Sequence, residues 1–263
     1  MKNLTIQQIV EELDIKPKKP LMISSDITRL WAEYRKAFKT FDPQRLIESL
    51  EEKVTKEGTL LLPTYSWDFC HGEGFHYERT IPRTGGLGRI ALKMKGFQRT
   101  SHPIYSFAVW GKDAEKLCAM TNQSSFGIDS PFHYMNTNAV DHLMIDLPFT
   151  KGYTFVHYIE ELVGVPYRYQ KNFTDQYVNR NGEKTIRTYS MYVRNLDMDL
   201  FYTDAIEMLL KDLVRQRNVY YGVEFKIINY ADSFPIIQND IVKNKSRRIA
   251  TYKGQELDGE NRR

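Results

Sequence analysis

Short apolar segments alternate with helix-forming segments through the first half of this chain. Leu21–Ile23, Thr59–Leu62 and Ala139–Leu147 have the length and composition of buried strands. Between the first two, Pro43–Lys56 places apolar residues at helical spacing. Strands that alternate with helices are typical of α/β proteins. The pattern therefore predicts an α/β fold with a largely parallel sheet.

The second half of the chain changes character at about residue 167. Asn181–Gly182 is a strong turn signal between two β-favouring arms, and it predicts an antiparallel hairpin over about 167–194 that projects from the main sheet. A helix is expected over Asp204–Gln216, a strand or strand pair over Val219–Ile228, and a charged tail from about residue 243. The length of 263 residues suits one large domain or two small ones, and we expect a single domain over 1–263.

Composition excludes several classes of protein. Hydrophobic residues make up 41% of the chain, and no window is apolar enough for a membrane span. The net charge of +4 is too small to favour binding to long nucleic acids, although it suits a small phosphate-bearing ligand. Two cysteines make no disulfide framework. We expect a cytoplasmic protein by default, because no signal directs the chain elsewhere.

Two polar segments beside apolar ones are the best candidates for chemistry. Arg99–Gly111 crowds Ser101 and His102 just before a strand, where His102 could contact a cofactor or only structure its loop. Gly152–Glu161 places His157 and Glu160 three residues apart on one helical face. A histidine near a helix start tends to stay neutral, as a general base must, although it could equally be a capping or core residue. Together the segments suggest an acyl-transfer enzyme.

Two further signals are weak. Arg83–Gly88 matches the R-x-x-G-x-G pattern of GNAT acetyltransferases, but it follows Pro82 instead of a long strand, so we interpret the match as a coincidence. Cys70, His71 and His76 share one loop without a second pair of ligands, and no metal site is expected.

Several motifs, in order, resemble those of the aminoglycoside 3-N-acetyltransferase family, also called the antibiotic N-acetyltransferase family. They extend over roughly residues 20 to 165 and are Met22–Ser25, Pro63–Tyr65, Thr84–Leu87, Arg99–Ser106, Gly127–Pro131 and Thr154–Glu160. The resemblance implies a three-layer α/β/α sandwich distinct from the GNAT fold. It also implies acyl-CoA as co-substrate, no metal, and direct transfer of the acyl group from the thioester to an amine.

With this chemistry, His157 is the expected general base. Glu160 is one candidate for the carboxylate that orients it, and Asp197 is the alternative that the family suggests. Thr64, at the end of a strand, is a candidate for polarising or positioning the thioester carbonyl. The expected cofactor contacts are Ser25, Thr84, Gly85, Arg99, Ser101 and His102, and the expected substrate contacts are Tyr65, Trp67 and Ser130.

The acceptor is the least constrained part of the prediction. Cations crowd the segment 168–194, which favours an anionic acceptor over a polycationic aminoglycoside. We therefore expect an N-acyltransferase that moves an acetyl or short hydroxyacyl group to a nucleotide-linked amino sugar for bacterial surface polysaccharide, such as lipopolysaccharide. An aminoglycoside 3-N-acetyltransferase that confers antibiotic resistance is the first alternative, and a non-catalytic nucleotide-sugar-binding protein is the second. A homodimer is left open beside a monomer.

Overall fold

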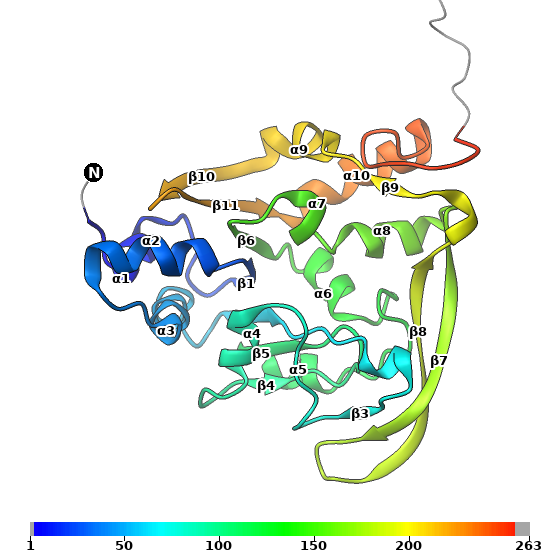
Figure 1. Ribbon diagram of the computed structural model, residues 1–263, viewed down its shortest axis with the longest axis horizontal. Coiled ribbons are helices and arrows are strands. Elements are labelled where there is room, and N and C mark those ends of the chain that lie inside the picture. Colours follow the sequence, from blue (N-terminus) through cyan, green and yellow to red (C-terminus); the bar gives the residue numbers. More distant parts are fainter. Residues whose placement is uncertain (1–2, 256–263) are drawn as a thin grey trace, which may run out of the picture.

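The computed structural model describes residues 3–255, and a seven-stranded mixed sheet forms its centre (Figure 1). The strand order is β10 (Val214–Tyr220), β11 (Val223–Asn229), β6 (Asp141–Ile145), β1 (Pro20–Ser25), β2 (Thr59–Pro63), β5 (Phe107–Gly111) and β4 (Gln98–Arg99). Only β6, β1 and β2 pair in parallel, and the other neighbours are antiparallel. The expectation of a largely parallel sheet is therefore wrong outside the centre. At one edge the reason is the short connection, because only two residues join β10 to β11 and a parallel pair requires a long crossover.

Helices cover both faces of this sheet. Along β1, Leu21 and Ile23 belong to one buried apolar core and Met22 to the other, because successive side chains of a strand point to opposite faces. The first core lies against α1 (Ile6–Glu12), α2 (Thr28–Phe38), α3 (Pro43–Val54) and α4 (Gly86–Ala91). The second lies against α5 (Ala114–Cys118), α6 (Pro131–Thr137), α7 (Phe149–Gly152), α8 (Val156–Val163), α9 (Ala205–Leu210) and α10 (Tyr230–Asn244). The three-layer α/β/α sandwich is thus confirmed.

The predicted hairpin is present and stands apart from the central sheet. β7 (Arg168–Val178) and β8 (Lys184–Arg194) pair along their whole length, and β3 (Phe75–His76) joins them in a three-stranded sheet. The hairpin bows along one side of the molecule in Figure 1. Gly182 in its turn has a φ of +80°, a conformation that favours glycine.

The carboxy-terminal third departs most from the sequence-based expectations. The helix expected over Asp204–Gln216 ends at Leu210, and the chain passes through a 3-10 turn (Lys211–Leu213) into β10. The edge of the sheet offers β10 a full set of backbone partners on β11, and this pairing overrides the helical pattern. The long helix α10 was not anticipated.

The charged tail expected from residue 243 is partly built into the fold. β12 (Ala250–Thr251) pairs with β9 (Phe201–Tyr202), and Ile249 is fully buried. Residues 256–263 of the tail lie outside the described residues.

The parallel centre of the sheet positions the candidate site. Since β1, β2 and β6 are parallel, their carboxyl ends meet at one edge, where open α/β sheets bind ligands. The short helices α7 and α8 follow β6 at this edge. Over residues 3–255 no helix has the length and apolar character needed to span a membrane.

Candidate active site

A cavity of about 590 Å³ opens at the carboxyl ends of the parallel strands. Its walls come from the end of β1, the start of α2, the segment after β2, the glycine-rich start of α4, and the loop between α7 and α8. The expected site residues that line it are Ser25, Tyr65, Trp67, Thr84, Gly85 and His157. These six residues thus line one cavity, and the roles expected for them stay predictions.

The glycine-rich start of α4 lies tightly against β2. A Cβ on Gly88 would come 2.0 Å from the Pro63 carbonyl oxygen, and one on Gly85 would come 2.9 Å from the same atom. Gly86 faces open space, with nothing within 4 Å of its Cβ position. Thus Gly85 and Gly88 allow close backbone packing, as in a scaffold element. The segment follows an irregular loop and not a long strand, in agreement with a coincidental GNAT match.

Two polar atoms of the cavity wall have no well-formed hydrogen bond. The Tyr65 hydroxyl and Thr84 Oγ1 are buried, and neither makes one within residues 3–255, although the Thr154 side chain lies close enough to Tyr65 to influence its pKa. The Tyr65 side chain is only 5% exposed, and burial raises the pKa of its hydroxyl well above the usual value. A buried polar group without a partner costs free energy, so these two atoms suit a ligand that supplies polar groups of its own.

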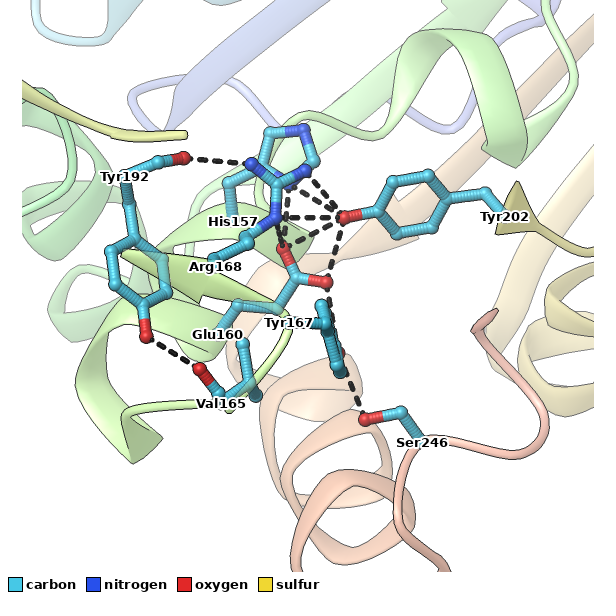
Figure 2. A network of polar contacts seen from close by, with 8 residues as sticks. All are labelled: His157, Glu160, Val165, Tyr167, Arg168, Tyr192, Tyr202 and Ser246. Atoms are coloured by element: carbon cyan, nitrogen blue, oxygen red, sulfur yellow. Dashed lines mark hydrogen bonds and ion pairs between the residues drawn. The ribbon is translucent and has the colours of Figure 1, made fainter. Parts of the chain in front are cut away.

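Beside this cavity, His157 takes part in a buried polar network (Figure 2). Its Nδ1 lies 2.8 Å from Oε2 of Glu160, which belongs to the same helix, α8. Glu160 is fully buried, and its carboxylate accepts from the Tyr202 hydroxyl at 2.7 Å and forms an ion pair with Arg168, whose Nε lies 2.8 Å from Oε2. The Tyr167 hydroxyl donates to Glu160 at 3.1 Å, and Ser246 contacts the same hydroxyl at 2.9 Å.

This network determines the protonation state of the His157 imidazole. Burial lowers the pKa of His157, the nearby Arg168 cation lowers it further, and Glu160 offsets only part of the shift. Burial raises the pKa of Glu160, but the hydrogen bond from His157 and the charge of Arg168 outweigh this and hold the pKa below its usual value. An ionised Glu160 accepts the proton on Nδ1, so Nε2 carries the free lone pair. Figure 2 shows Nε2 on the edge of the ring that points away from Glu160.

The two carboxylates proposed from the sequence occupy different environments. Glu160 makes the contact with His157, as its i, i+3 spacing predicts. Asp197 is exposed on a 3-10 turn (Leu196–Met198), with its backbone N–H bonded to the Asn195 side chain. Glu160 is therefore the orienting partner in this structure, and the Asp197 alternative is not supported.

Several expected cofactor contacts instead belong to the scaffold. Arg99 is 2% exposed and donates to the backbone oxygens of Thr64 and Thr80 and to Ser106 Oγ. His102 is also 2% exposed, and its Nδ1 accepts from the backbone N–H groups of Ile104 and Tyr105. Both side chains therefore face the interior and not the cavity.

The three other expected contacts away from the cavity also have structural partners. Ser101 donates to the Cys118 carbonyl at 3.0 Å, and the buried Thr64 hydroxyl shares a 2.8 Å hydrogen bond with Ser106. Ser130 caps α6 by accepting from the His133 N–H. The sequence placed them in the site because polar groups crowd near strand ends. The spacing of apolar residues along the sequence does not show whether the polar side chains of a loop point into the protein interior.

Sequence analysis missed the groups that hold Glu160. Arg168 was counted among the surface cations of the hairpin, although its side chain is 6% exposed and paired with Glu160. No sequence motif pointed to Tyr202 on β9, to Tyr167 just before β7, or to Ser246 after α10. These residues lie far apart in the chain from Glu160 or from one another. The only sign in the sequence that this arginine could be buried is that Arg168 stands between Tyr167 and Tyr169.

No group of three or more His, Cys, Asp or Glu side chains in the described part of the chain could hold a metal ion. Cys70, His71 and His76 lie in this described part and belong to no such group.

Comparisons with known proteins agree with this architecture. The SPbeta prophage-derived aminoglycoside N(3')-acetyltransferase-like protein YokD of Bacillus subtilis is 29% identical over 94 residues, a match that covers 27% of this chain and 35% of YokD. The chain thus matches about a third of the length of this curated relative.

Two solved structures have the same fold. AAC-IIIb with CoASH superposes with a TM-score of 0.75 at 16% identity, covering 93% of this chain and 97% of that one. Sisomicin-bound AAC-VIa gives a TM-score of 0.72 at 19% identity, covering 91% and 97%. A family model described as aminoglycoside 3-N-acetyltransferase matches residues 22–242. This chain therefore belongs to the aminoglycoside 3-N-acetyltransferase family.

Proposed function

We propose that this protein transfers an acetyl group from acetyl-CoA to an amine of an amino sugar. The observation that carries the proposal is the 2.8 Å contact between Nδ1 of His157, at the cavity wall, and the buried Glu160 carboxylate. The lowered pKa values of both groups favour a neutral imidazole beside an ionised carboxylate. Family membership and the fold shared with CoASH-bound AAC-IIIb support acetyl-CoA as the donor.

In the proposed reaction His157 acts as general base. Its Nε2 takes a proton from the amine nitrogen as that nitrogen attacks the thioester carbonyl carbon. The carbon–sulfur bond breaks, and the imidazolium can return the proton to the departing CoA sulfur. Glu160 stabilises the imidazolium, while Arg168 and Tyr202 keep Glu160 ionised and oriented. A positioned base of this kind is worth about 10²–10⁴-fold in rate.

The larger cavity is the proposed site for the pantetheine arm of acetyl-CoA. The unpartnered Tyr65 hydroxyl and Thr84 Oγ1 would bond to its amide groups, and the open face of Gly86 leaves room beside the chain. Ser25 and Gly85 line the same cavity. Thr64 is not assigned a role with the thioester, because its hydroxyl is already bonded to Ser106.

For the acceptor, the relatives favour an aminoglycoside-like amino sugar over the nucleotide-linked one expected from the sequence. Part of the charge argument for the nucleotide-linked sugar also fails. Arg168 is neutralised by Glu160, Arg180 bonds to Gln98, and the Arg187 guanidinium lies over the Tyr177 ring. Only some of the hairpin cations therefore remain available to an acceptor.

The test is to incubate the protein with acetyl-CoA and a panel of amino sugars that includes aminoglycosides. Free CoA thiol is measured over time, and the product is identified by mass spectrometry. We expect thiol release that depends on the acceptor, together with an acetylated amine. Thermal stabilisation by CoA without transfer to any acceptor would instead indicate a protein that binds its ligands without catalysis.

A further inference from the structure

A second, smaller cavity of about 90 Å³ lies on the other side of His157. Its walls come from α7, the loop between α7 and α8, the end of β8, β9 and the start of α9. His157 and Lys151 line both cavities, so a group in the small cavity would lie next to the proposed general base. The larger cavity is the one proposed for the donor, which leaves this one on the acceptor side.

The charged side chains of the small cavity have one sign. Lys151 and Arg194 line it, and no aspartate or glutamate is among its lining residues. Both cations are exposed, and neither forms an ion pair with a carboxylate within residues 3–255. The Arg194 guanidinium lies 5.5 Å from the centre of the Tyr202 ring, which holds it beside His157.

Neither Glu160 nor Asp26 forms an ion pair with Lys151 or Arg194. Glu160 is the acid next to His157, and it is fully buried and already paired with Arg168. Asp26 lines the larger cavity, accepts from the Thr28 N–H, and lies near enough to Lys151 for that cation to lower its pKa, so Arg194 is the cation with the less compensated charge. An acceptor that reaches His157 therefore meets two unpaired cations.

We propose that the small cavity is an acceptor subsite for a negatively charged group, a phosphate or a carboxylate, carried by the amino sugar whose amine is acetylated. The inference rests on the proposed function and narrows its acceptor. A polycationic acceptor would be repelled by Lys151 and Arg194, whereas an anionic substituent would pair with them. The same positive field favours a neutral amine over an ammonium group beside His157, and only the neutral amine can attack the thioester.

The experiment compares amino sugars that differ in charge. Glucosamine is the reference without an anionic group. Glucosamine 6-phosphate and the uronic acid of glucosamine carry the two anionic groups, UDP-glucosamine carries a diphosphate, and kanamycin is the polycation. For each, kcat/KM with acetyl-CoA is measured, and calorimetry in the presence of CoA measures binding without turnover. Comparing glucosamine 6-phosphate with the uronic acid shows whether the subsite prefers a phosphate or a carboxylate.

Two variants test the cations and one serves as a matched control. Arg194→Gln and Lys151→Gln remove charges from the small cavity. Arg180→Gln removes a charge from the same hairpin as Arg194, but its guanidinium bonds to Gln98 instead. We expect an anionic acceptor to be preferred at least tenfold over glucosamine, and this preference to fall about tenfold in Arg194→Gln but not in Arg180→Gln.

The proposal is overturned if kanamycin is the preferred acceptor, or if Arg194→Gln and Lys151→Gln leave the preference for anionic sugars unchanged. Failure of the proposed function has a different signature. In that case anionic sugars bind by calorimetry and lose affinity in Arg194→Gln, while no acceptor releases CoA thiol.

Discussion

Replacing Glu160 by Gln separates the catalytic role of this network from its structural role. The amide oxygen can take the place of Oε2 and still accept from His157 Nδ1. The amide NH₂ would then face the Tyr167 hydroxyl, which can rotate to accept from it, whereas the Tyr202 hydroxyl already accepts from Arg168 Nε and Nη2. Glu160→Gln therefore removes the negative charge while keeping most of the hydrogen bonds.

The expected losses follow from burial. Arg168 has 6% of its side chain exposed, and without its partner it becomes an uncompensated buried cation, which costs about 3–5 kcal/mol of folding free energy. His157 remains neutral at pH 7, because removing the carboxylate lowers its pKa further. It becomes a poorer base, however, since nothing stabilises the imidazolium. We expect kcat to fall about 10²-fold or more.

A double variant distinguishes the two effects. Adding Arg168→Met to Glu160→Gln removes the unpaired cation and should restore part of the stability in urea unfolding, but it should not restore kcat. Glu161→Gln is the matched control on the same helix, because Glu161 bonds to Ser124 and not to His157. If Glu160→Gln folds and keeps kcat within a few-fold of the parent, the proposed role of the carboxylate is refuted.

Three further predictions concern the scaffold. Gly88→Ala should destabilise the protein by about 2 kcal/mol or more in thermal unfolding, because its Cβ would meet the Pro63 carbonyl oxygen. Gly86→Ala should be neutral or stabilising, and equal effects of the two substitutions would contradict the packing argument. His102→Asn should flatten the dependence of stability on pH. The pKa of buried His102 is about 3, so the unfolded chain takes up a proton below pH ~6.5 that the folded chain does not, and between pH 7 and 5 the parent should lose about 2 kcal/mol more than the variant in urea titrations. Arg99→Met should lower the melting temperature but leave the CoA dissociation constant within a few-fold, and a large loss of CoA affinity in the folded variant would restore Arg99 as a cofactor contact.

Local patterns in the sequence were sufficient to predict the centre of the fold and the contact between His157 and Glu160. Apolar runs such as Leu21–Ile23 and Thr59–Leu62 are buried strands, and the i, i+3 spacing of His157 and Glu160 brings their side chains into contact. Both features depend on residues close together in the chain, where backbone geometry decides the outcome.

Features that depend on contacts between residues far apart in the chain could not be predicted from the sequence. The partners of Glu160 outside α8 are Tyr167 just before β7, Arg168 at the start of β7 and Tyr202 on β9, while Ser246 after α10 contacts Tyr167, and only the folded chain brings them together. Polar groups in Arg99–Ser106 suggested a binding loop, because a sequence does not show whether polar side chains find partners inside the protein. Arg99 and His102 are buried with internal partners, which a sequence pattern cannot show, and their expected cofactor contacts stay predictions.

The most direct test of the proposed activity is acetyl transfer by the parent protein and by His157→Asn, with the acceptor that reacts best in the panel. CoA affinity is measured separately by calorimetry, so that a change in binding is not mistaken for a change in chemistry. We expect His157→Asn to bind CoA like the parent and to lose about 10²–10⁴-fold in kcat. Turnover within a few-fold of the parent, at unchanged CoA affinity, would show that His157 is structural and would contradict the proposed mechanism.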